Sequence, residues 1–340
     1  MKYLLVDTAN LFSRARHSTP RGADTWSKLG LALHITFNGI LKADRLHKPD
    51  HVIFCLEARS WRKDHTGSYK ANRKVTRDKM STKEAEEDAE FWACFDDLSK
   101  WLAERTNATV IRVERAEADD LIARWIALHP EDQHTILSND SDFMQLLAPN
   151  VDIYNGLTNQ LINLNGYFDD WGKPVKDKKT KEVKTVPDPE WLLFEKCMRG
   201  DTSDNVFSAY PGVRTKGTAK KVGLLEAFAD RNSKGWNWNN MMLQKWTDHN
   251  GVEHRVLDRY MANRELIDLT AHPAEIREHI DAHLLQVTTK DHSQIGTQLI
   301  KFCSKYELVK LSENVKPLAE ILSKSLPVLH RHEEKDVKNI

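Results

Sequence analysis

The sequence predicts an α/β fold in which a mostly parallel central sheet is flanked by helices and followed by a helical part. Over the first two thirds of the 340 residues, short apolar and β-branched runs alternate with longer segments of helical periodicity. Beyond about residue 188 the strand signals fade, while helical patterns continue to about residue 325. A chain of this length can bury a core in one large domain or in two modest ones.

Four strands and three helices account for the alternating part. The strand candidates are the apolar runs at 3–6, 51–56, 109–113 and 134–137. Helical periodicity separates them at 26–46, 84–106 and 117–128. Because a crossover helix between neighbouring strands makes those strands parallel, this order predicts a largely parallel sheet with helices on both faces.

The remaining chain is predicted to be helical, with patterns at 188–199, 217–230, 252–268, 273–284, 294–306 and 314–325. A lysine-rich segment at 173–184 and a tryptophan- and asparagine-rich segment at 231–251 are interpreted as inserted loops or hairpins. We divide the chain into an α/β core at 1–187, a helical part at 188–328 and a polar tail at 329–340, which we expect to be disordered.

Composition narrows the function classes. The 50 basic and 50 acidic side chains give a formal charge of zero, so any attraction to a polyanion must be local. The most apolar stretch, 29–41, is too short to cross a bilayer, and the first residues form no charged-then-apolar leader. We therefore expect a soluble, cytoplasmic protein with no membrane partner. The four cysteines lie far apart without a C-x-x-C pair, which argues against a zinc site or a disulfide framework.

Acidic residues follow every predicted strand. The carboxyl ends of parallel strands lie at one edge of a sheet, where open α/β folds bind ligands. The acids predicted to meet there are Asp7, Glu57, Glu117, Asp119, Asp120, Asp140 and Asp142. Any one of them alone could be a helix cap or a turn residue. Together they repel one another unless cations bind, and oxygen-only ligands favour Mg²⁺ or Mn²⁺ over zinc.

Asp201 and Asp204 in R-G-D-T-S-D-N extend this acidic set. They lie where the α/β part joins the helical part, and both face the same way if the turn is helical. The alternative is a capped helix terminus. With these two residues the acids suffice for two or more ions, and a pair of Mg²⁺ ions about 4 Å apart supports in-line displacement at phosphorus. Phosphodiester hydrolysis is therefore the leading hypothesis.

Basic side chains dominate the segment that follows Glu57. It contains Arg59, Arg62, Lys63, Lys70, Arg73, Lys74, Arg77, Lys79 and Lys83 against only Asp64 and Asp78. Such a run can be a solvated helical face. Beside an anionic metal cluster it fits a polyanionic substrate, because lysine and arginine neutralise phosphates. Trp61 and Tyr69 could add stacking on unpaired bases.

A second basic element is Y-P-G-V-R-T-K-G-T-A-K-K at 210–221. Its glycines permit close approach of a phosphate. Lys216, Lys220 and Lys221 stand at a predicted helix start, whose backbone N–H groups would bind that phosphate. A Pro-Gly turn before a helix is also an ordinary connection. In the company of the acids, we interpret this element as a grip on a duplex backbone.

The order of these motifs resembles the structure-specific 5′-nuclease family, which includes flap endonucleases, phage 5′-nucleases and the 5′-nuclease domain of bacterial DNA polymerase I. Five motifs within residues 1–225 carry the resemblance: V-D-T-A-N-L-F-S-R with Asp7, Asn10 and Arg14, S-Y-K-A-N-R with Tyr69, Lys70 and Arg73, then E-A-D-D, N-D-S-D and G-D-T-S-D-N. The compact chain is most similar to the phage branch, which includes the phage RNase H.

The resemblance implies a PIN-like sheet, hydrolysis that leaves a 5′-phosphate, a basic helical arch at about 58–90 and a helix-three-turn-helix at about 190–230. It also implies that Lys70 and Arg73 contact the scissile phosphate and act with Asp7, Asp119 and Asp142 as the catalytic set. With the basic segments included, the expected nucleic-acid contacts are Arg14, Arg62, Lys63, Tyr69, Lys70, Arg73, Lys74, Arg77, Gly212, Val213, Lys216, Gly217, Lys220 and Lys221. A K⁺ ion at 212–221 is a further implied cofactor.

Three places depart from the family pattern. Glu57 stands where the family usually has aspartate, and its extra methylene alters the geometry around the first metal ion. Thr8 replaces the usual glycine after the first aspartate. Arg214 and Thr215 interrupt the family's V-x-G-I-G pattern in the turn that holds K⁺.

We therefore expect a Mg²⁺-dependent 5′-nuclease that cuts branched or 5′-ended DNA, or RNA primers in RNA–DNA hybrids, during replication or repair. It is expected to be a monomer that works with replication proteins, in the bacterial host cytoplasm if a phage encodes it. One alternative is a ribonuclease of the related acidic-pocket fold, which would not need 216–221. Another is a non-catalytic binder of DNA junctions in which Glu57 marks a decayed site, although eight further acids are intact.

Overall fold

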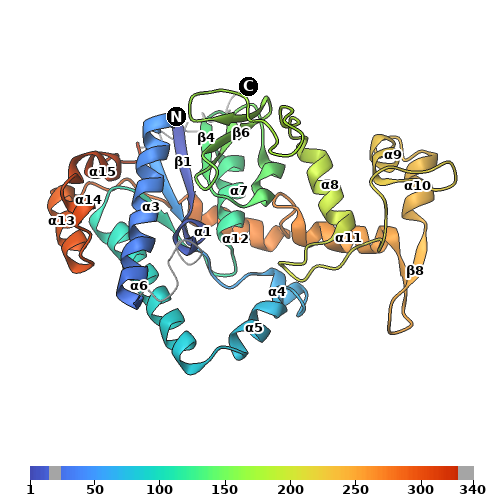
Figure 1. Ribbon diagram of the computed structural model, residues 1–340, viewed down its shortest axis with the longest axis horizontal. Coiled ribbons are helices and arrows are strands. Elements are labelled where there is room, and N and C mark those ends of the chain that lie inside the picture. The colour runs from blue at the N-terminus through green and yellow to red at the C-terminus, as the bar shows by residue number, and fades with distance from the viewer. Residues whose placement is uncertain (15–23, 328–340) are drawn as a thin grey trace, which may run out of the picture.

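A seven-stranded sheet lies between two layers of helices in the computed structural model, which describes residues 1–14 and 24–327 (Figure 1). The strand order is β3-β2-β1-β4-β5-β6-β7. The parallel strands are β1 (Lys2–Asp7), β2 (His51–Cys55), β3 (Thr109–Ile111), β4 (Gln133–Leu137) and β5 (Val151–Asn155). The predicted α/β class with a mostly parallel sheet is confirmed. The predicted tail at 329–340 lies outside the described residues.

One edge of the sheet is antiparallel and was not predicted. There β5 pairs with β6 (Gln160–Asn163), and β6 pairs with β7 (Gly166–Asp169). These strands are only four or five residues long and mix polar with apolar residues, so periodicity gives them little signal. The lysine-rich insert at 173–184 continues this edge through isolated bridges, including Lys176 with Val183.

Each face of the sheet carries its own helices because side chains alternate along the strands. Leu4 and Val6 of β1 point into a core with α1 (Thr8–Ser13), α3 (Thr25–His47) and α6 (Thr82–Arg105). Tyr3 and Leu5 point to the other face, against α7 (Ala118–Leu128) and α12 (Ala274–Leu284). The predicted helices at 26–46, 84–106 and 117–128 agree with α3, α6 and α7 to within two residues.

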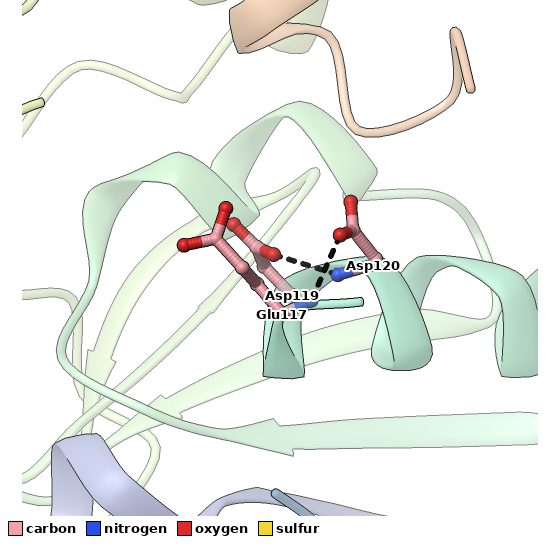
Figure 2. A group of neighbouring side chains, drawn as sticks. All are labelled: Glu117, Asp119 and Asp120. Atoms are coloured by element: carbon pink, nitrogen blue, oxygen red, sulfur yellow. Dashed lines mark hydrogen bonds between the residues drawn. The ribbon is translucent and has the colours of Figure 1, made fainter. Parts of the chain in front are cut away.

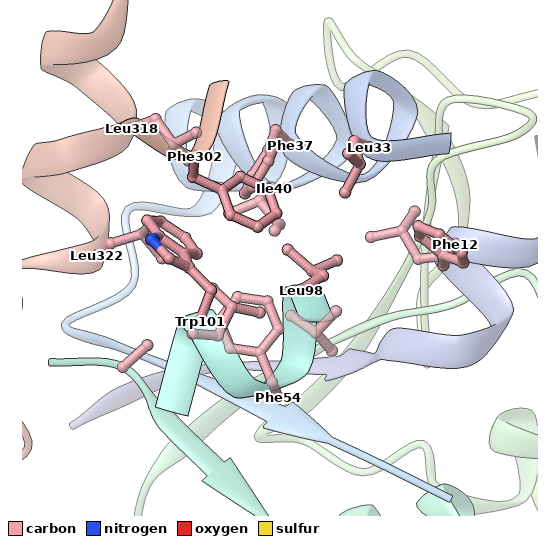
Figure 3. Packing of buried hydrophobic residues seen from close by; sticks show 14 of the residues in the cluster. Phe12, Leu33, Phe37, Ile40, Phe54, Leu98, Trp101, Phe302, Leu318 and Leu322 are labelled. Atoms are coloured by element: carbon pink, nitrogen blue, oxygen red, sulfur yellow. The ribbon is translucent and has the colours of Figure 1, made fainter. Parts of the chain in front are cut away.

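The last described helices return to this core. Helices α13 (Ile295–Lys305), α14 (Val309–Ser312) and α15 (Val315–Leu322) lie beside α3 (Figure 1). Phe302, Leu318 and Leu322 pack with Phe37 and Trp101 in one buried cluster (Figure 3). Full burial of one Leu or Phe side chain stabilises the fold by about 1.5–3 kcal/mol. Residues 295–322 are therefore part of the α/β body.

A separate hydrophobic cluster holds α8 (Pro189–Arg199), α9 (Leu224–Ala229), α10 (Trp236–Met242) and α11 (Val256–Ile267) together. The predicted helix at 217–230 is wrong in extent, since only 224–229 is helical. The predicted helix at 252–268 begins at Val256, after the hairpin of β8 (Lys245–Thr247) and β9 (Glu253–Arg255). We therefore restrict the proposed DNA-binding part to residues 189–267.

Across residues 1–14 and 24–327, none of the helices has the length and apolar character needed to span a membrane.

His51 links the sheet to the C-terminal segment, and its burial should make the stability of the fold depend on pH. Its Nδ1–H donates to the Lys324 carbonyl at 2.9 Å, and its Nε2 accepts from the Thr109 hydroxyl at 2.8 Å. Burial lowers the pKa of His51 from 6.5 to about 4. The unfolded chain therefore takes up a proton before the folded protein does. The free energy of unfolding should fall as the pH drops from 6.5 to 4, by at most about 1.4 kcal/mol per pH unit.

Urea unfolding at several pH values between 7 and 4 measures this slope. His51→Gln should flatten it, whereas the same change at the exposed His249 should leave it as in the wild type. Equal slopes for His51→Gln and the wild type would show that His51 does not cause the pH dependence.

Candidate metal centre

A cavity of about 490 Å³ opens beyond the carboxyl ends of the parallel strands. The acids that line it are Asp7, Glu57, Glu117, Asp119, Asp140, Asp142, Asp201 and Asp204. Its cationic lining residues are Lys70, Arg73, Arg77 and Lys196. Every predicted acid except Asp120 therefore reaches one cavity, as the common edge of the strands requires.

An arch beside this cavity connects β2 to α6. It consists of α4 (Arg62–His65), α5 (Ala71–Asp78) and the first turns of α6 (Figure 1). No residue of α5 is buried, so Arg73, Lys74 and Arg77 face solvent. Ser81 begins α6 with a capping box, in which its side chain and that of Glu84 each bond the other's backbone N–H.

Asp7 is a buried acid at the end of the central strand β1. It ends β1 and caps α1 by accepting a hydrogen bond from the Asn10 backbone N–H at 3.3 Å. Ser138 donates its hydroxyl to the other oxygen at 2.9 Å. Burial and the neighbouring Glu57 raise the pKa of Asp7 to about 7, against the lowering effect of Ser138. A bound cation would favour the charged carboxylate, because an opposite charge lowers the pKa of an acid.

Glu117, Asp119 and Asp120 converge at the start of α7, with one ligand atom of each within 4.8 Å of the others (Figure 2). The Glu117 backbone N–H donates to Asp120 at 2.9 Å, and the Asp120 N–H donates to Asp119 at 2.7 Å. Desolvation and the nearby Asp120 raise the pKa of Asp119. The helix start thus crowds three acids together, and crowding of this kind favours cation binding.

Asp120 differs from the other acids because it is buried outside the cavity, where Arg62 and His272 contact it. Arg62 lies 2.9 Å from its Oδ1, and His272 Nε2 lies 2.9 Å from the same carboxyl oxygen. Arg62 also donates to Glu117 at 3.1 Å and to the Leu266 carbonyl at 2.7 Å. Although burial opposes ionisation, Arg62 and His272 lower the pKa of Asp120. Asp120 is fully buried and does not line the cavity.

Arg62 is therefore a correction to the sequence prediction. Only 1% of it is exposed, so it holds carboxylates in place and does not face a nucleic acid. Tyr69 is buried as well, with its hydroxyl 3.0 Å from both Glu117 and Asp204. The predicted stacking on bases by Tyr69 and Trp61 is wrong for the same reason, since both rings are about 3% exposed. The sequence showed the basic run but not which members turn inward.

Lys70 and Arg73 lie among the carboxylates. Lys70 pairs with Glu117 and lies 3.7 Å from Asp204, and Arg73 lies 3.1 Å from Asp204. Although burial opposes its charge, Glu117 raises the pKa of Lys70. Lys70 adopts a left-handed backbone conformation with φ 53°, which directs the chain from the end of α4 into α5. Both side chains are thus held beside the cavity by its acids.

The loop that carries Asp201 and Asp204 is joined to the arch. The Lys70 backbone N–H donates to the Asp204 carbonyl at 2.9 Å, and Asn205 donates to the Ser68 carbonyl at 2.8 Å. Gly200 begins the loop with φ 78°, and a Cβ there would lie 2.3 Å from the Val206 carbonyl oxygen. Only glycine fits this close approach. The strain-free turn at Gly200 therefore brings both acids to the cavity.

Lys196 was not predicted from the sequence. Its ammonium group pairs with Asp142 and lies 2.7 Å from Asp201. Although desolvation opposes ionisation, Lys196 and Ser203 lower the pKa of Asp201 to about 2. Other groups that the sequence did not single out include Ser60, Ser138, His272 and Trp92. Lys196 and His272 reach the acids only through the packing of α8 and of the 268–273 loop.

The basic element at 210–221 lies away from the cavity, since none of its residues lines it. The expected helix start at Lys216 is wrong, because the chain folds back on itself before α9. The carboxylate of Glu226 accepts the backbone N–H groups of Gly217 and Gly223 at 3.0 and 2.9 Å. These two amides are thus occupied by a protein acid. Lys216, Lys220 and Lys221 remain exposed, while Arg14 donates to the Gly156 carbonyl at 3.0 Å.

Comparisons with known proteins fit this geometry. The family model of the N-terminal resolvase-like domain of 5′-3′ exonucleases matches residues 2–172. DNA polymerase I of Rhizobium leguminosarum is 27% identical over 271 residues, which is 78% of this chain and 23% of that protein. Flap endonuclease Xni of Shewanella loihica is 28% identical over 231 residues, which is 67% of this chain and 77% of that protein. The chain thus spans about a quarter of the polymerase.

Solved structures show the same fold. The T5 flap endonuclease with metal ions superposes with a TM-score of 0.55 at 16% identity, covering 94% of this chain and 100% of that one. A complex of a variant of that enzyme with DNA and metal ions gives a TM-score of 0.54 at 16% identity over the same shares. At this identity the likeness shows the fold alone.

Arg62→Met should lower the free energy of unfolding by about 3–5 kcal/mol, because it removes the buried cation that Glu117 and Asp120 share. Urea unfolding measures the loss. Arg59→Met removes an exposed partner of Asp64 and is the matched control, for which no shift of the midpoint is expected. If Arg62→Met keeps its stability but binds DNA more weakly, Arg62 would contact nucleic acid as the sequence predicted.

Lys196→Met should make thermal stability depend on divalent metal. Without metal ions the variant should melt roughly 2–6 °C below the wild type, because Asp142 and Asp201 lose their shared cation. Millimolar Mg²⁺ or Mn²⁺ should reduce this difference by replacing that charge. Lys305→Met removes a surface pair with Asp97 and serves as the control. A deficit that metal ions do not change would count against a metal site here.

Proposed function

This chain belongs to the 5′-3′ exonuclease family, and we propose that it is a Mg²⁺-dependent 5′-nuclease that hydrolyses phosphodiester bonds at 5′ ends or flaps of DNA. One observation carries the proposal. Eight carboxylates from four strand ends and the 200–204 loop line a single cavity whose rim carries Lys70, Arg73 and Arg77. Metal-binding acids beside phosphate-binding cations form the arrangement that phosphoryl chemistry requires.

The acids form two groups that would each hold metal. Glu117 and Asp119 lie together at the start of α7. Asp142 and Asp201 share the ammonium group of Lys196, so their carboxylates also lie close to one another. All these ligand atoms are carboxylate oxygens, which suit Mg²⁺ or Mn²⁺. Bound metal would activate water and stabilise the leaving oxygen. Asp120 would position Glu117 through their mutual hydrogen bond and Arg62.

Lys70 and Arg73 would hold the scissile phosphate. Both pair with acids of the cavity, and both would be released toward a substrate once divalent cations neutralise those acids. Lys63, Lys74 and Arg77 are exposed along the arch and would neutralise phosphates of the approaching strand. The product would carry a 5′-phosphate.

The 212–221 turn would grip the duplex through Lys216, Lys220 and Lys221. A K⁺ ion in this turn remains part of the proposal, and backbone carbonyl oxygens would supply its ligands. The T5 flap endonuclease complex contains DNA, and we extend that substrate class to this chain. The same proposal includes RNA–DNA hybrids as substrates and a role in replication or repair with replication proteins. It also includes a monomeric state and a place in the cytoplasm of a phage host.

Purified protein should cut a 5′-flap duplex near the junction, or stepwise from its 5′ end, with Mg²⁺ or Mn²⁺ but not with EDTA. Labels at either end of the flap strand distinguish these two modes. Cleavage of single-stranded RNA in preference to every duplex would favour the ribonuclease alternative. Binding without cleavage in any metal would favour the junction binder.

Asp142→Ala and Asp201→Ala should each lower turnover by about 100-fold or more while DNA affinity changes little, because ligand loss removes transition-state stabilisation more than phosphate contacts. Asp96→Ala, on the exposed surface of α6, is the matched control and should cut normally. An equal loss of binding in both cavity variants would contradict the metal assignment.

A further inference from the structure

The loop at 268–273, between α11 and α12, sends one side chain to the acids from outside the cavity. Nε2 of His272 lies 2.9 Å from Oδ1 of Asp120, and the His272 side chain is only 1% exposed. An ionised carboxylate only accepts hydrogen bonds, so Nε2 carries the proton and donates it. His272 does not line the cavity. It therefore contacts the acidic cluster without facing a substrate.

Asp120 connects this contact to two candidate metal ligands. Its Oδ2 accepts the Glu117 backbone N–H at 2.9 Å, and its own backbone N–H donates to the Asp119 carboxylate at 2.7 Å (Figure 2). Arg62 lies within 3.1 Å of both oxygens of Asp120. Arg62 and His272 together thus orient this carboxylate. A rotation of Asp120 would disturb the first turn of α7, and with it Glu117 and Asp119.

Packing alone does not favour a histidine at position 272. Its Nδ1 is buried and has no hydrogen-bond partner among the described residues. A buried polar atom without a partner costs free energy that an apolar side chain of similar size would avoid. The hydrogen bond to Asp120 is therefore what the imidazole adds at this place.

The loop that carries the histidine is fixed at its start. The Gln145 side chain accepts the Leu269 backbone N–H at 2.8 Å and donates to the Ile267 carbonyl at 3.1 Å. Gln145 belongs to the short 3-10 helix η1 (Ser141–Leu146), which follows β4 at the carboxyl edge of the sheet. The imidazole thus approaches Asp120 from a segment that is itself held at this edge.

We propose that His272 is a positioning residue that holds Asp120, and through it the metal ligands Glu117 and Asp119, in the geometry that binds divalent cations. This inference rests on the metal centre of the proposed function. It gives the loop before α12 a part in metal binding, although that loop lies outside the cavity. Groups that orient metal ligands from behind typically change metal affinity by about 10- to 100-fold when they are removed.

The test measures Mn²⁺ binding to the purified protein without DNA, by isothermal titration calorimetry. His272→Leu should weaken this binding by about 10- to 100-fold. His272→Gln, whose amide can donate to Asp120 from a similar reach, should stay within about threefold of the wild type, because the orienting hydrogen bond is kept. Cleavage of a 5′-flap duplex by His272→Leu should need correspondingly more Mg²⁺, yet reach the wild-type rate at saturating metal.

His134→Leu is the matched control. His134 is 2% exposed, its Nε2 lies 2.9 Å from the His129 carbonyl oxygen, and its Nδ1 likewise lacks a partner in the described part of the chain. It does not line the cavity, so its loss should leave Mn²⁺ affinity unchanged. Thermal melting in EDTA reports whether each variant is folded. If His272→Leu does not fold, His272→Asn, which is too short to reach Asp120, takes its place with the same expected loss.

Wild-type Mn²⁺ affinity in the variant that lacks the hydrogen bond would overturn the positioning role. An equal loss in His134→Leu, or no recovery in His272→Gln, would overturn it as well. If the wild type binds no Mn²⁺, the metal centre and this role fail together. If it binds Mn²⁺ but cuts no flap in any metal, the nuclease function fails, while the Mn²⁺ comparison still decides the role of His272.

Discussion

Electrostatic crowding at the carboxyl edge of the sheet is the constraint on which the rest of this structure depends. Eight carboxylates share one cavity, and burial with mutual repulsion raises the pKa of Asp7 and Asp119. Protein cations offset part of this repulsion at separate places. Arg62 reaches the acids from within the protein, Lys70 from the arch and Lys196 from α8. These contacts hold the carboxylates of the proposed metal site in place.

The side chains that contact the acids also join parts of the chain that are distant in sequence. Arg62 connects the arch to Glu117 and Asp120 at the start of α7 and to the Leu266 carbonyl at the end of α11. His272 approaches Asp120 from the loop before α12. Tyr69 belongs to the hydrophobic cluster of α8–α11 while its hydroxyl contacts Glu117 and Asp204. The acidic cluster, the arch and the proposed duplex-binding part are therefore packed as one unit.

The family match covers only part of the residues that line the cavity. The match over residues 2–172 establishes the family, and it ends before Lys196, Asp201 and Asp204. Asp201 and Asp204 were predicted from their motif, and the structure shows that α8 and the Gly200 turn bring them to the same cavity as the other acids. Glu57 remains at the cavity edge with the other acids, so its extra methylene has not removed it from the site.

The sequence by itself determined the α/β class, four of the five parallel strands, the acids at their ends and the basic character of the arch. Periodicity and strand-end position are local properties, and they specify which residues share an edge. Tertiary packing alone decided that Arg62 and Tyr69 turn inward, that Glu226 occupies the 217–223 turn and that α13–α15 cover α3. It also placed Lys196, His272 and Trp92 at the site. A side chain's partners come from elements far along the chain, and no local pattern encodes that proximity.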